Sequence, residues 1–343
     1  ESIFPSSDGP ARMMATVGGS PRESRRGSRG VARALPGNSS AECWGTRIHK
    51  ILLLGGTGQL GTALQSRLRG ECRAPSHAEC PLADPDALRQ LCDQFAPDVI
   101  LNAAAYNRVD LAESEPDAAW RINALGPRML AVEAQRLGAR LVHISTDHVF
   151  AAPPNPTDAT PPRPHPGWRE ADPPSPASVY AVTKLAGEHF VRAASPRHLV
   201  VRTCGLYGPA RSPGKGNFVT TMLRLGRERG EVRVVDDQVC TPTSAADLAT
   251  ALLALLDRGA EGLFHMTNSG QASWCEFARE IFRQSGDPVR VVPISTAQFA
   301  APARRPAHSV LACDRLTAAL GQPPRDWQTA LADYLGTLRT GGT

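Results

Sequence analysis

Residues 51–61 read Ile-Leu-Leu-Leu-Gly-Gly-Thr-Gly-Gln-Leu-Gly. Four apolar residues have the length of a buried strand, and a glycine-rich turn and the start of a helix follow them. Glycines allow a tight turn and a close approach to a pyrophosphate, which the free N–H groups of a helix start attract. The stretch therefore favours a dinucleotide-binding loop over an ordinary strand–helix turn. The loop residues expected to contact the dinucleotide are Gly55, Gly58, Gln59, Leu60 and Gly61.

Apolar segments of strand length alternate with segments of helical periodicity on both sides of this loop. We expect strands at 51–54, 98–103, 140–145 and 198–202, and helices at about 58–68, 116–137 and 178–194. This alternation predicts an α/β fold, a Rossmann-like doubly wound parallel sheet. Shorter elements after residue 205 predict a smaller lobe. We therefore expect an NAD(P)-binding domain over 47–204, joined by segments that return later, and a mainly substrate-binding lobe over 205–343.

The positive charge of the chain is concentrated at its beginning. The net charge is +5, and residues 1–50 hold eight Lys or Arg against four acids, so the remaining body is nearly neutral. A near-neutral body argues against a nucleic-acid partner, which usually needs a basic surface. Residues 1–46 are rich in Gly, Ser, Arg and Pro without periodicity, which predicts a disordered basic tail, with a transit peptide as the alternative.

The apolar and cysteine content indicate the class of protein. Hydrophobic residues make up 41% of 343, enough for a sizeable core, and no run of 18 apolar residues predicts a membrane span. The eight cysteines are scattered, without a C-x-x-C pair, so we expect free thiols in a reducing cytoplasm. No acidic cluster suggests a metal, so none is predicted.

A second motif is Ser-Val-Tyr-Ala-Val-Thr-Lys at 178–184. The spacing of four residues places Tyr180 and Lys184 on one face of a helix. An ammonium group near a phenol favours phenolate, so we expect Lys184 to lower the pKa of Tyr180. The pair is typical of proton transfer in carbonyl reduction; the alternative is a core tyrosine beside a surface lysine.

Two strand ends supply further candidates. Thr146 and Asp147 follow the strand at 140–145, and parallel-sheet proteins bind ligands at such carboxyl ends. The Thr146 hydroxyl is a candidate hydrogen-bond partner for the reacting oxygen, although a helix cap would use the same residues. After the strand at 98–103, small residues permit a close approach of a cofactor, or equally serve packing. The candidates there are Ala104, Ala105 and Tyr106.

With these residues placed, the chain resembles the extended short-chain dehydrogenase/reductases, and within them the dTDP-4-dehydrorhamnose reductase family. The likeness runs from Lys50 to about Leu338. It includes Gly-Gly-Thr-Gly-Gln-Leu-Gly at 55–61, Pro-Asp-Val-Ile-Leu-Asn-Ala-Ala-Ala-Tyr at 97–106, Val-Asp at 109–110, Ala-Glu-Ser-Glu at 112–115, Ser-Thr-Asp-His-Val-Phe at 145–150, Tyr-Ala-Val-Thr-Lys-Leu-Ala-Gly-Glu at 180–188, Gly-Lys-Gly-Asn-Phe at 214–218, Asp-Asp-Gln-Val-Cys-Thr-Pro-Thr at 236–243 and Ala-Arg-Arg-Pro at 303–306. The last of these are not generic to the superfamily, so they indicate the narrower family.

The resemblance implies a reaction and roles for the residues. A reduced nicotinamide would deliver hydride to C4 of dTDP-4-dehydro-L-rhamnose, giving dTDP-L-rhamnose. Tyr180 would donate the proton, Lys184 would tune Tyr180, and Thr146 would hydrogen-bond the substrate. Further substrate contacts are implied for Asp147, Asn217, Arg304 and Arg305, the arginines because a guanidinium fork suits a diphosphate. For the arginines, surface salt bridges are the alternative.

Two positions bear on substrate and cofactor choice. Many family members carry Trp in an Arg-Thr-Ser-Trp stretch near the sugar, where this chain has Gly205. After the second strand, Ser76 stands where an acid would grip the ribose 2′-hydroxyl of NAD, and Arg73 is nearby. These two residues favour NADP(H) over NAD(H), with NAD(H) possible.

Two other functions fit the same motifs. One is a nucleotide-sugar epimerase or dehydratase, which would retain its NAD. The other is a non-catalytic regulatory subunit like the methionine adenosyltransferase β subunit. Expected partners are a dTDP-linked 4-keto-6-deoxysugar, no nucleic acid and no membrane, with the chain as a monomer or homodimer.

Overall fold

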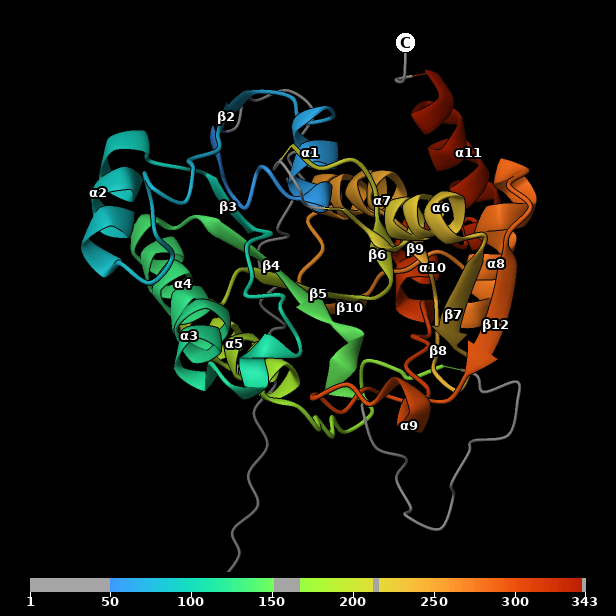
Figure 1. Ribbon diagram of the computed structural model, residues 1–343. Coiled ribbons are helices and arrows are strands. Elements are labelled where there is room, and N and C mark those ends of the chain that lie inside the picture. Colours follow the sequence, from blue (N-terminus) through green and yellow to red (C-terminus); the bar gives the residue numbers. More distant parts are fainter. Residues whose placement is uncertain (1–49, 151–166, 212–215, 341–343) are drawn as a thin grey trace, which may run out of the picture. The chain divides into compact units, whose positions relative to one another are not determined.

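A six-stranded parallel sheet carries the fold in the computed structural model, which describes residues 50–150, 167–211 and 216–340 (Figure 1). Its strand order is β10-β5-β4-β3-β1-β2. The strands are β1 (Lys50–Leu54), β2 (Glu71–Arg73), β3 (Val99–Asn102), β4 (Arg140–Thr146), β5 (His198–Thr203) and β10 (Gly262–His265). The chain progresses in opposite directions on the two sides of β1, and ligands bind such sheets at this switch point. The predicted doubly wound parallel sheet is confirmed.

Both faces of the sheet are covered by helices, which explains why its inner strands are mainly apolar, whereas the edge strand β2 is exposed. Leu52, Ile100 and Leu141 belong to a core on one face, and Leu53, Leu101 and Val142 to a core on the other. Helices α2 (Pro85–Phe95), α4 (Gly126–Leu137) and α5 (Val179–Ala194) cover the first face, and α1 (Gln59–Gln65), α7 (Ala245–Asp257) and α10 (Asp314–Leu320) cover the second.

The helix expected over 116–137 is interrupted. It consists of α3 (Pro116–Trp120), a π-helical turn η3 (Arg121–Leu125) and α4. Asn123, inside the π turn, is buried, and its amide bonds the backbone of Tyr106 in both directions. A π turn often marks a functional site, and this one positions a loop expected to bind the cofactor.

A second group of elements forms its own core. Tyr207, Phe277 and Trp327 are buried together in it. Its members are α6 (Phe218–Arg229), β7 (Glu231–Val235), α8 (Trp274–Ser285), β12 (Arg290–Ile294) and α11 (Trp327–Thr340), and β7 pairs in parallel with β12. The smaller elements between them are β6 (Leu206–Tyr207), β8 (Val239–Cys240), β9 (Thr243–Ser244), β11 (Ala272–Ser273) and α9 (Thr296–Phe299). β10, which follows residue 204 in the chain, belongs to the large sheet. The division into two domains at residue 204 stays a prediction.

Several expectations concern segments outside the described residues. They are the predicted basic tail over 1–46 and, within it, Cys43. Across the described ranges, no helix has both the length and the apolar composition needed to cross a membrane. The seven cysteines in these ranges are free thiols, as expected.

Candidate active site

The glycine-rich loop after β1 has the geometry that a dinucleotide requires. Gly55 has a φ of +80°, and a Cβ there would lie 2.6 Å from the backbone nitrogen of Ala104. A Cβ at Gly61 would overlap the carbonyl oxygen of Gly55. Helix α1 begins after Gly58 without a side-chain cap, so no side chain competes for the N–H groups of its first turn. The backbone therefore leaves room and donors for a pyrophosphate.

Polar side chains hold the neighbouring strand ends in place. The Asn102 amide lies 3.1 Å from Nδ1 of His143, and its carbonyl oxygen accepts from the backbone of Ala104 at 3.1 Å. Ala105 is exposed, and the phenol of Tyr106 donates to Glu115 at 2.6 Å. The loop 104–106 thus lies beside the glycine-rich loop, as its assignment to cofactor binding requires.

The segment after β2 contains an acid that sequence reasoning missed. The carboxylate of Glu79 accepts from the backbone nitrogen of Ser76 at 2.7 Å and lies 3.5 Å from the guanidinium of Arg73. These hydrogen bonds with Ser76 lower the pKa of Glu79. Sequence analysis considered only the position of Ser76 itself, whereas the chain turns back there and brings Glu79 from three residues further on.

Tyr180 and Thr146 meet at the carboxyl end of the sheet. Thr146 is the last residue of β4, and Tyr180 lies in the first turn of α5, half-buried. The Thr146 hydroxyl lies close enough to the phenol to favour its ionised form, and it donates to Oδ1 of Asp147 at 3.1 Å. Burial raises the pKa of Tyr180 to about 12, the charge of Asp147 adds to the rise, and the Thr146 hydroxyl opposes it. The expected lowering of this pKa was wrong for the chain alone, because burial of the phenol dominates.

Lys184 lies one helical turn after Tyr180, and its side chain is buried. Its Nζ donates to the carbonyl oxygen of Ile144 on β4 at 2.6 Å. Burial lowers the pKa of Lys184 to about 8, and the charge of Glu188 opposes the shift. Lys184 is therefore a buried amine that is partly charged near neutral pH.

Glu188 was not predicted as a site residue, yet it anchors the helix that carries Tyr180 and Lys184. Its carboxylate accepts from Nε and Nη2 of Arg202 at 2.9 and 2.7 Å and from the Ser145 hydroxyl at 2.5 Å. Glu188 and Arg202 are 1% and 2% exposed. The helical spacing of four residues from Lys184 was a signal in the sequence, but the partners lie on β4 and β5.

Asp147 and His148 add two further titratable groups. Asp147 is buried, and burial raises its pKa, although His148, Ser309 and Thr146 oppose the shift. The ring of His148 lies edge-on to Tyr180, with centroids 5.5 Å apart, and its buried Nδ1 has no hydrogen-bond partner in the part of the chain that the structure describes. Burial lowers the pKa of His148, and nearby Arg305 adds to this, so the ring is neutral. Its position directly after Asp147 was the only signal in the sequence.

The predicted substrate residues differ in their surroundings. The guanidinium of Arg305 is paired with Asp110, whereas the side chain of Arg304 is exposed. Asn217 caps α6, and its amide donates to the Gly208 carbonyl at 2.9 Å and to the Tyr334 hydroxyl at 2.8 Å. Both of its amide hydrogens therefore bond the protein itself.

Gly205 occupies the position where a Trp is frequent in the family it resembles. Its φ is +55°, and a Cβ would lie 3.0 Å from the carbonyl oxygen of Thr241. A side chain at this position would be strained by its backbone conformation and would crowd the neighbouring segment. The backbone conformation thus explains why this residue is glycine. No aromatic side chain is present at this position to stack on a sugar.

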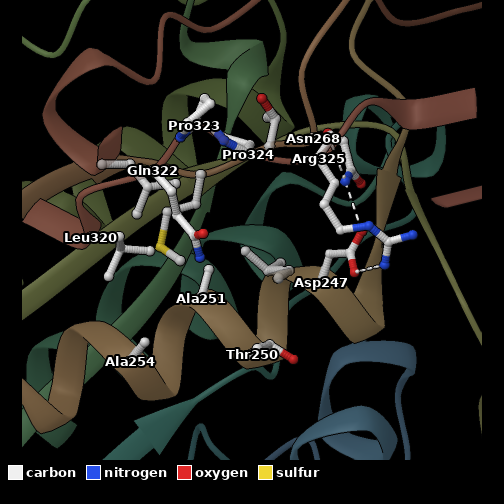
Figure 2. A pocket seen from close by; sticks show the side chains of 14 residues that line it. Asp247, Thr250, Ala251, Ala254, Asn268, Leu320, Gln322, Pro323, Pro324 and Arg325 are labelled. Atoms are coloured by element: carbon white, nitrogen blue, oxygen red, sulfur yellow. Dashed lines mark hydrogen bonds and ion pairs between the residues drawn. The ribbon is translucent and has the colours of Figure 1, made fainter. Parts of the chain in front are cut away.

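A cavity of about 160 Å³ lies away from these groups, between α7 and the segment after α10 (Figure 2). On its polar side, Asp247 accepts from the Asn268 amide at 2.8 Å and from Arg325 at 3.1 Å. Because these groups satisfy one another, they hold the segment after α10 against α7. Thr146, Tyr180 and Lys184 do not line this cavity.

The order of these motifs along one parallel sheet matches a known family over nearly the whole described chain. The sequence profile of the RmlD substrate binding domain matches residues 49–340. The chain belongs to this family. It is therefore an NAD(P)-dependent reductase of the extended short-chain dehydrogenase/reductase type, and the predicted resemblance is confirmed.

Individual relatives agree with this assignment. The dTDP-4-dehydrorhamnose reductase of Mycobacterium tuberculosis (strain ATCC 25618 / H37Rv) is 42% identical over 294 residues, which cover 84% of this chain and 93% of the relative. The spore coat polysaccharide biosynthesis protein SpsK of Bacillus subtilis is 37% identical, over 83% of this chain and 96% of the relative. The crystal structure of the Bacillus anthracis dTDP-4-dehydrorhamnose reductase in complex with NADP is similar with a TM-score of 0.78 and 35% identity, covering 85% of this chain and 100% of that one.

Proposed function

We propose that this RmlD-family reductase converts dTDP-4-dehydro-L-rhamnose to dTDP-L-rhamnose with NADPH. The observation that carries the proposal is that Tyr180, in the first turn of α5, and Thr146, at the end of β4, meet at the carboxyl end of the sheet. The two residues lie at the edge of the sheet that also presents the glycine-rich loop. The identity of 42% to a dTDP-4-dehydrorhamnose reductase supports the choice of sugar.

In this reaction the chain handles the proton. The glycine-rich loop would hold the pyrophosphate of the dinucleotide, whose reduced nicotinamide would supply the hydride for C4 of the sugar. The alkoxide that develops at O4 takes the phenolic proton of Tyr180, which stays protonated at neutral pH because burial raises its pKa to about 12. Thr146 holds the same oxygen by a hydrogen bond, and the Lys184 ammonium stabilises the phenolate that Tyr180 becomes. Solvent returns the proton to Tyr180.

Substrate and cofactor are held by the remaining groups. Asp147 is assigned to the sugar, and Arg305 and Arg304 to the diphosphate, which a planar guanidinium binds through two parallel hydrogen bonds. Asn217 acts in this scheme through the fold of its loop, because its amide hydrogens bond Gly208 and Tyr334. Ser76, Ala104, Ala105 and Tyr106 would contact the bound cofactor.

The proposal takes NADP(H) as the preferred cofactor. The ion pair of Arg73 with Glu79 is exposed and long, at 3.5 Å. A 2′-phosphate can therefore compete with Glu79 for the guanidinium of Arg73. The NADP complex of the Bacillus anthracis relative supports the same choice. Glu79 is the residue that would instead accept a hydrogen bond from a 2′-hydroxyl, as in NAD-binding sheets.

A single assay separates this function from the two others. Purified protein is mixed with dTDP-4-dehydro-L-rhamnose and either NADPH or NADH, and the absorbance of the reduced nicotinamide is followed. We expect stoichiometric loss of absorbance, with kcat/KM at least tenfold higher for NADPH. An epimerase or dehydratase would convert the sugar without net loss of absorbance, and a regulatory subunit would do neither. Either result would refute the proposal.

Lys184 provides a prediction for the pH dependence. Its pKa of about 8 lies below its ordinary value of 10.5 because of burial. If its charge stabilises the phenolate, kcat should fall as the pH rises through about 8. The stability effect has the opposite sign: the cost of the buried charge is complete below pH 8 and disappears between pH 8 and 10.5, because the folded state there binds fewer protons. This group alone therefore does not unfold the protein at alkaline pH.

The measurement is kcat against pH at saturating substrates, together with a thermal denaturation curve at each pH. Lys184→Met should be slow at every pH and should lack the inflection. An inflection that persists unchanged in this variant would assign the titration to another group.

A further inference from the structure

Two carboxylates on one short turn contact the two parts of the proposed site: the segment that contains Arg305 and the helix that carries Tyr180. The turn comprises Asp110, which precedes the 3₁₀ helix η2, and η2 itself (Leu111–Glu113). Asp110 faces the segment that contains Arg305, and Glu113 faces the start of the helix that carries Tyr180. The inference drawn from this geometry rests on the proposed function.

Asp110 holds Arg305 by the end of its guanidinium group. Its Oδ1 accepts from Nη1 at 2.8 Å and its Oδ2 from Nη2 at 2.7 Å. Oδ1 also accepts from the backbone nitrogen of Ala303 at 3.2 Å, and Nη1 donates to the Ala303 carbonyl at 3.2 Å. The carboxylate thus fixes both the side chain and the loop from which it projects. Arg305 is 20% exposed and Asp110 is 42% exposed.

This arrangement leaves one edge of the guanidinium available. The two hydrogen bonds to Asp110 and the one to Ala303 use three of the five N–H groups. The remaining two, on Nε and Nη2, point in the same direction and have no acceptor among the described residues. They form the planar fork that binds a phosphate through two parallel hydrogen bonds. An arginine that is already held needs to lose little side-chain entropy on binding.

Glu113 contacts the start of α5, the helix that carries Tyr180. Its Oε1 accepts from the backbone nitrogen of Val179 at 2.9 Å, and the Ser178 hydroxyl accepts from Ala181 at 3.2 Å. Together they cap the first turn of α5, which contains Tyr180. A cap fixes the position of the first helical turn, so Glu113 determines where the phenol lies relative to the turn.

We infer that Asp110 and Glu113 are positioning residues that set the distance between the diphosphate-binding Arg305 and the proton donor Tyr180. A nucleoside diphosphate sugar anchored on the free edge of Arg305 then presents its carbonyl to the phenol. Misplacement of reacting groups by about 1 Å can cost about a hundredfold in rate. The opposite idea, that Asp110 competes with the substrate for Arg305, predicts tighter substrate binding when the carboxylate is removed.

The two carboxylates should affect different kinetic constants. Asp110→Asn weakens the orientation of Arg305, so we expect KM for the nucleotide sugar to rise roughly tenfold, with kcat within about twofold of the unmodified protein. Glu113→Ala loosens the first turn of α5, so we expect kcat to fall roughly tenfold with KM nearly unchanged. A merely structural defect would change the thermal denaturation midpoint and affect both constants together. Equal effects of both variants on both constants would overturn the inference.

Binding of thymidine diphosphate tests Asp110 separately from turnover. Isothermal titration calorimetry should show binding weakened roughly tenfold by Asp110→Asn and unchanged by Glu113→Ala. In an Arg305→Met background, Asp110→Asn should have no further effect, because the group it orients is gone. Glu231→Gln, which breaks the exposed pair of Glu231 with Arg290, is the matched control and should change neither constant.

The outcomes distinguish a failure of the proposed function from a failure of the role inferred for Asp110. Failure of the unmodified protein to reduce the 4-keto sugar, with binding of thymidine diphosphate still dependent on Asp110, refutes the proposed function and retains the role of Asp110. Unchanged or tighter binding by Asp110→Asn overturns the inference, whatever the result of the activity assay.

Discussion

Tyr180→Phe is expected to lower kcat for reduction by roughly 10²- to 10⁴-fold, the range that a general acid contributes. The phenol is the protonated group placed beside Thr146, and burial keeps it protonated by raising its pKa to about 12. Phenylalanine has the same ring and lacks the proton. Cofactor binding should remain within about twofold, because the glycine-rich loop is unchanged. The measurements are single-turnover loss of the reduced-nicotinamide absorbance and a fluorescence titration with NADPH.

Tyr207→Phe is the matched control. The Tyr207 hydroxyl is buried and has no hydrogen-bond partner within residues 50–150, 167–211 and 216–340, so its removal leaves no group there unpaired. This variant should retain both rate and stability. Wild-type turnover by Tyr180→Phe would show that another group donates the proton.

Glu188→Gln is expected to lower the free energy of unfolding by about 3–5 kcal/mol, the usual cost of removing one partner of a buried ion pair. Arg202 is 2% exposed, so its charge would remain in the core without a counter-ion. The Arg202 guanidinium also lies 5.0 Å from the centre of the Phe150 ring, which keeps it in place. The free energy of unfolding of both proteins is measured by urea denaturation, monitored by circular dichroism.

Two further variants test the cause of this loss. Glu228→Gln breaks the exposed pair of Glu228 with Arg224, in which both side chains are more than half exposed, and should cost less than about 1 kcal/mol. Replacing both Glu188 and Arg202 by Met removes the uncompensated charge and should recover much of the stability. A loss below about 1 kcal/mol for Glu188→Gln would mean that water or another group compensates Arg202.

The sheet could be predicted because its inner strands β1, β3, β4 and β5 are buried on both faces. Such strands are short apolar runs, and the segments near 51–54, 98–103, 140–145 and 198–202 stand out from their polar surroundings. A second strand was expected before Ser76, but without bounds, because all three residues of β2 (Glu71–Arg73) are exposed. β10 was missed because its four residues carry no distinct pattern. The π turn at Arg121–Leu125 was missed because its apolar spacing is compatible with a continuous helix.

The site was predictable only where its residues are close together in the sequence. Tyr180 and Lys184 share one helix face, and Gly55 to Gly61 form one loop, so spacing alone assigns their chemistry. Glu79, which reaches Ser76 through a turn of the chain, was overlooked because no periodicity marks it. The direction of the Tyr180 pKa shift was also wrong, because burial depends on packing that spacing does not contain.

The sequence by itself determined the local chemistry of this protein: a glycine-rich loop after a buried strand, and a Tyr-x-x-x-Lys helix. These follow from the conformational freedom of glycine and from the 3.6-residue period of a helix. Only the tertiary structure decided the partners, such as Glu188 with Arg202 and Asp110 with Arg305, which are 195 residues apart in the latter case. The reason is that burial and charge pairing depend on which strands and loops become neighbours in space. Tyr180 shows both: its helix places it one turn from Lys184, whereas its proton affinity depends on the groups that enclose it.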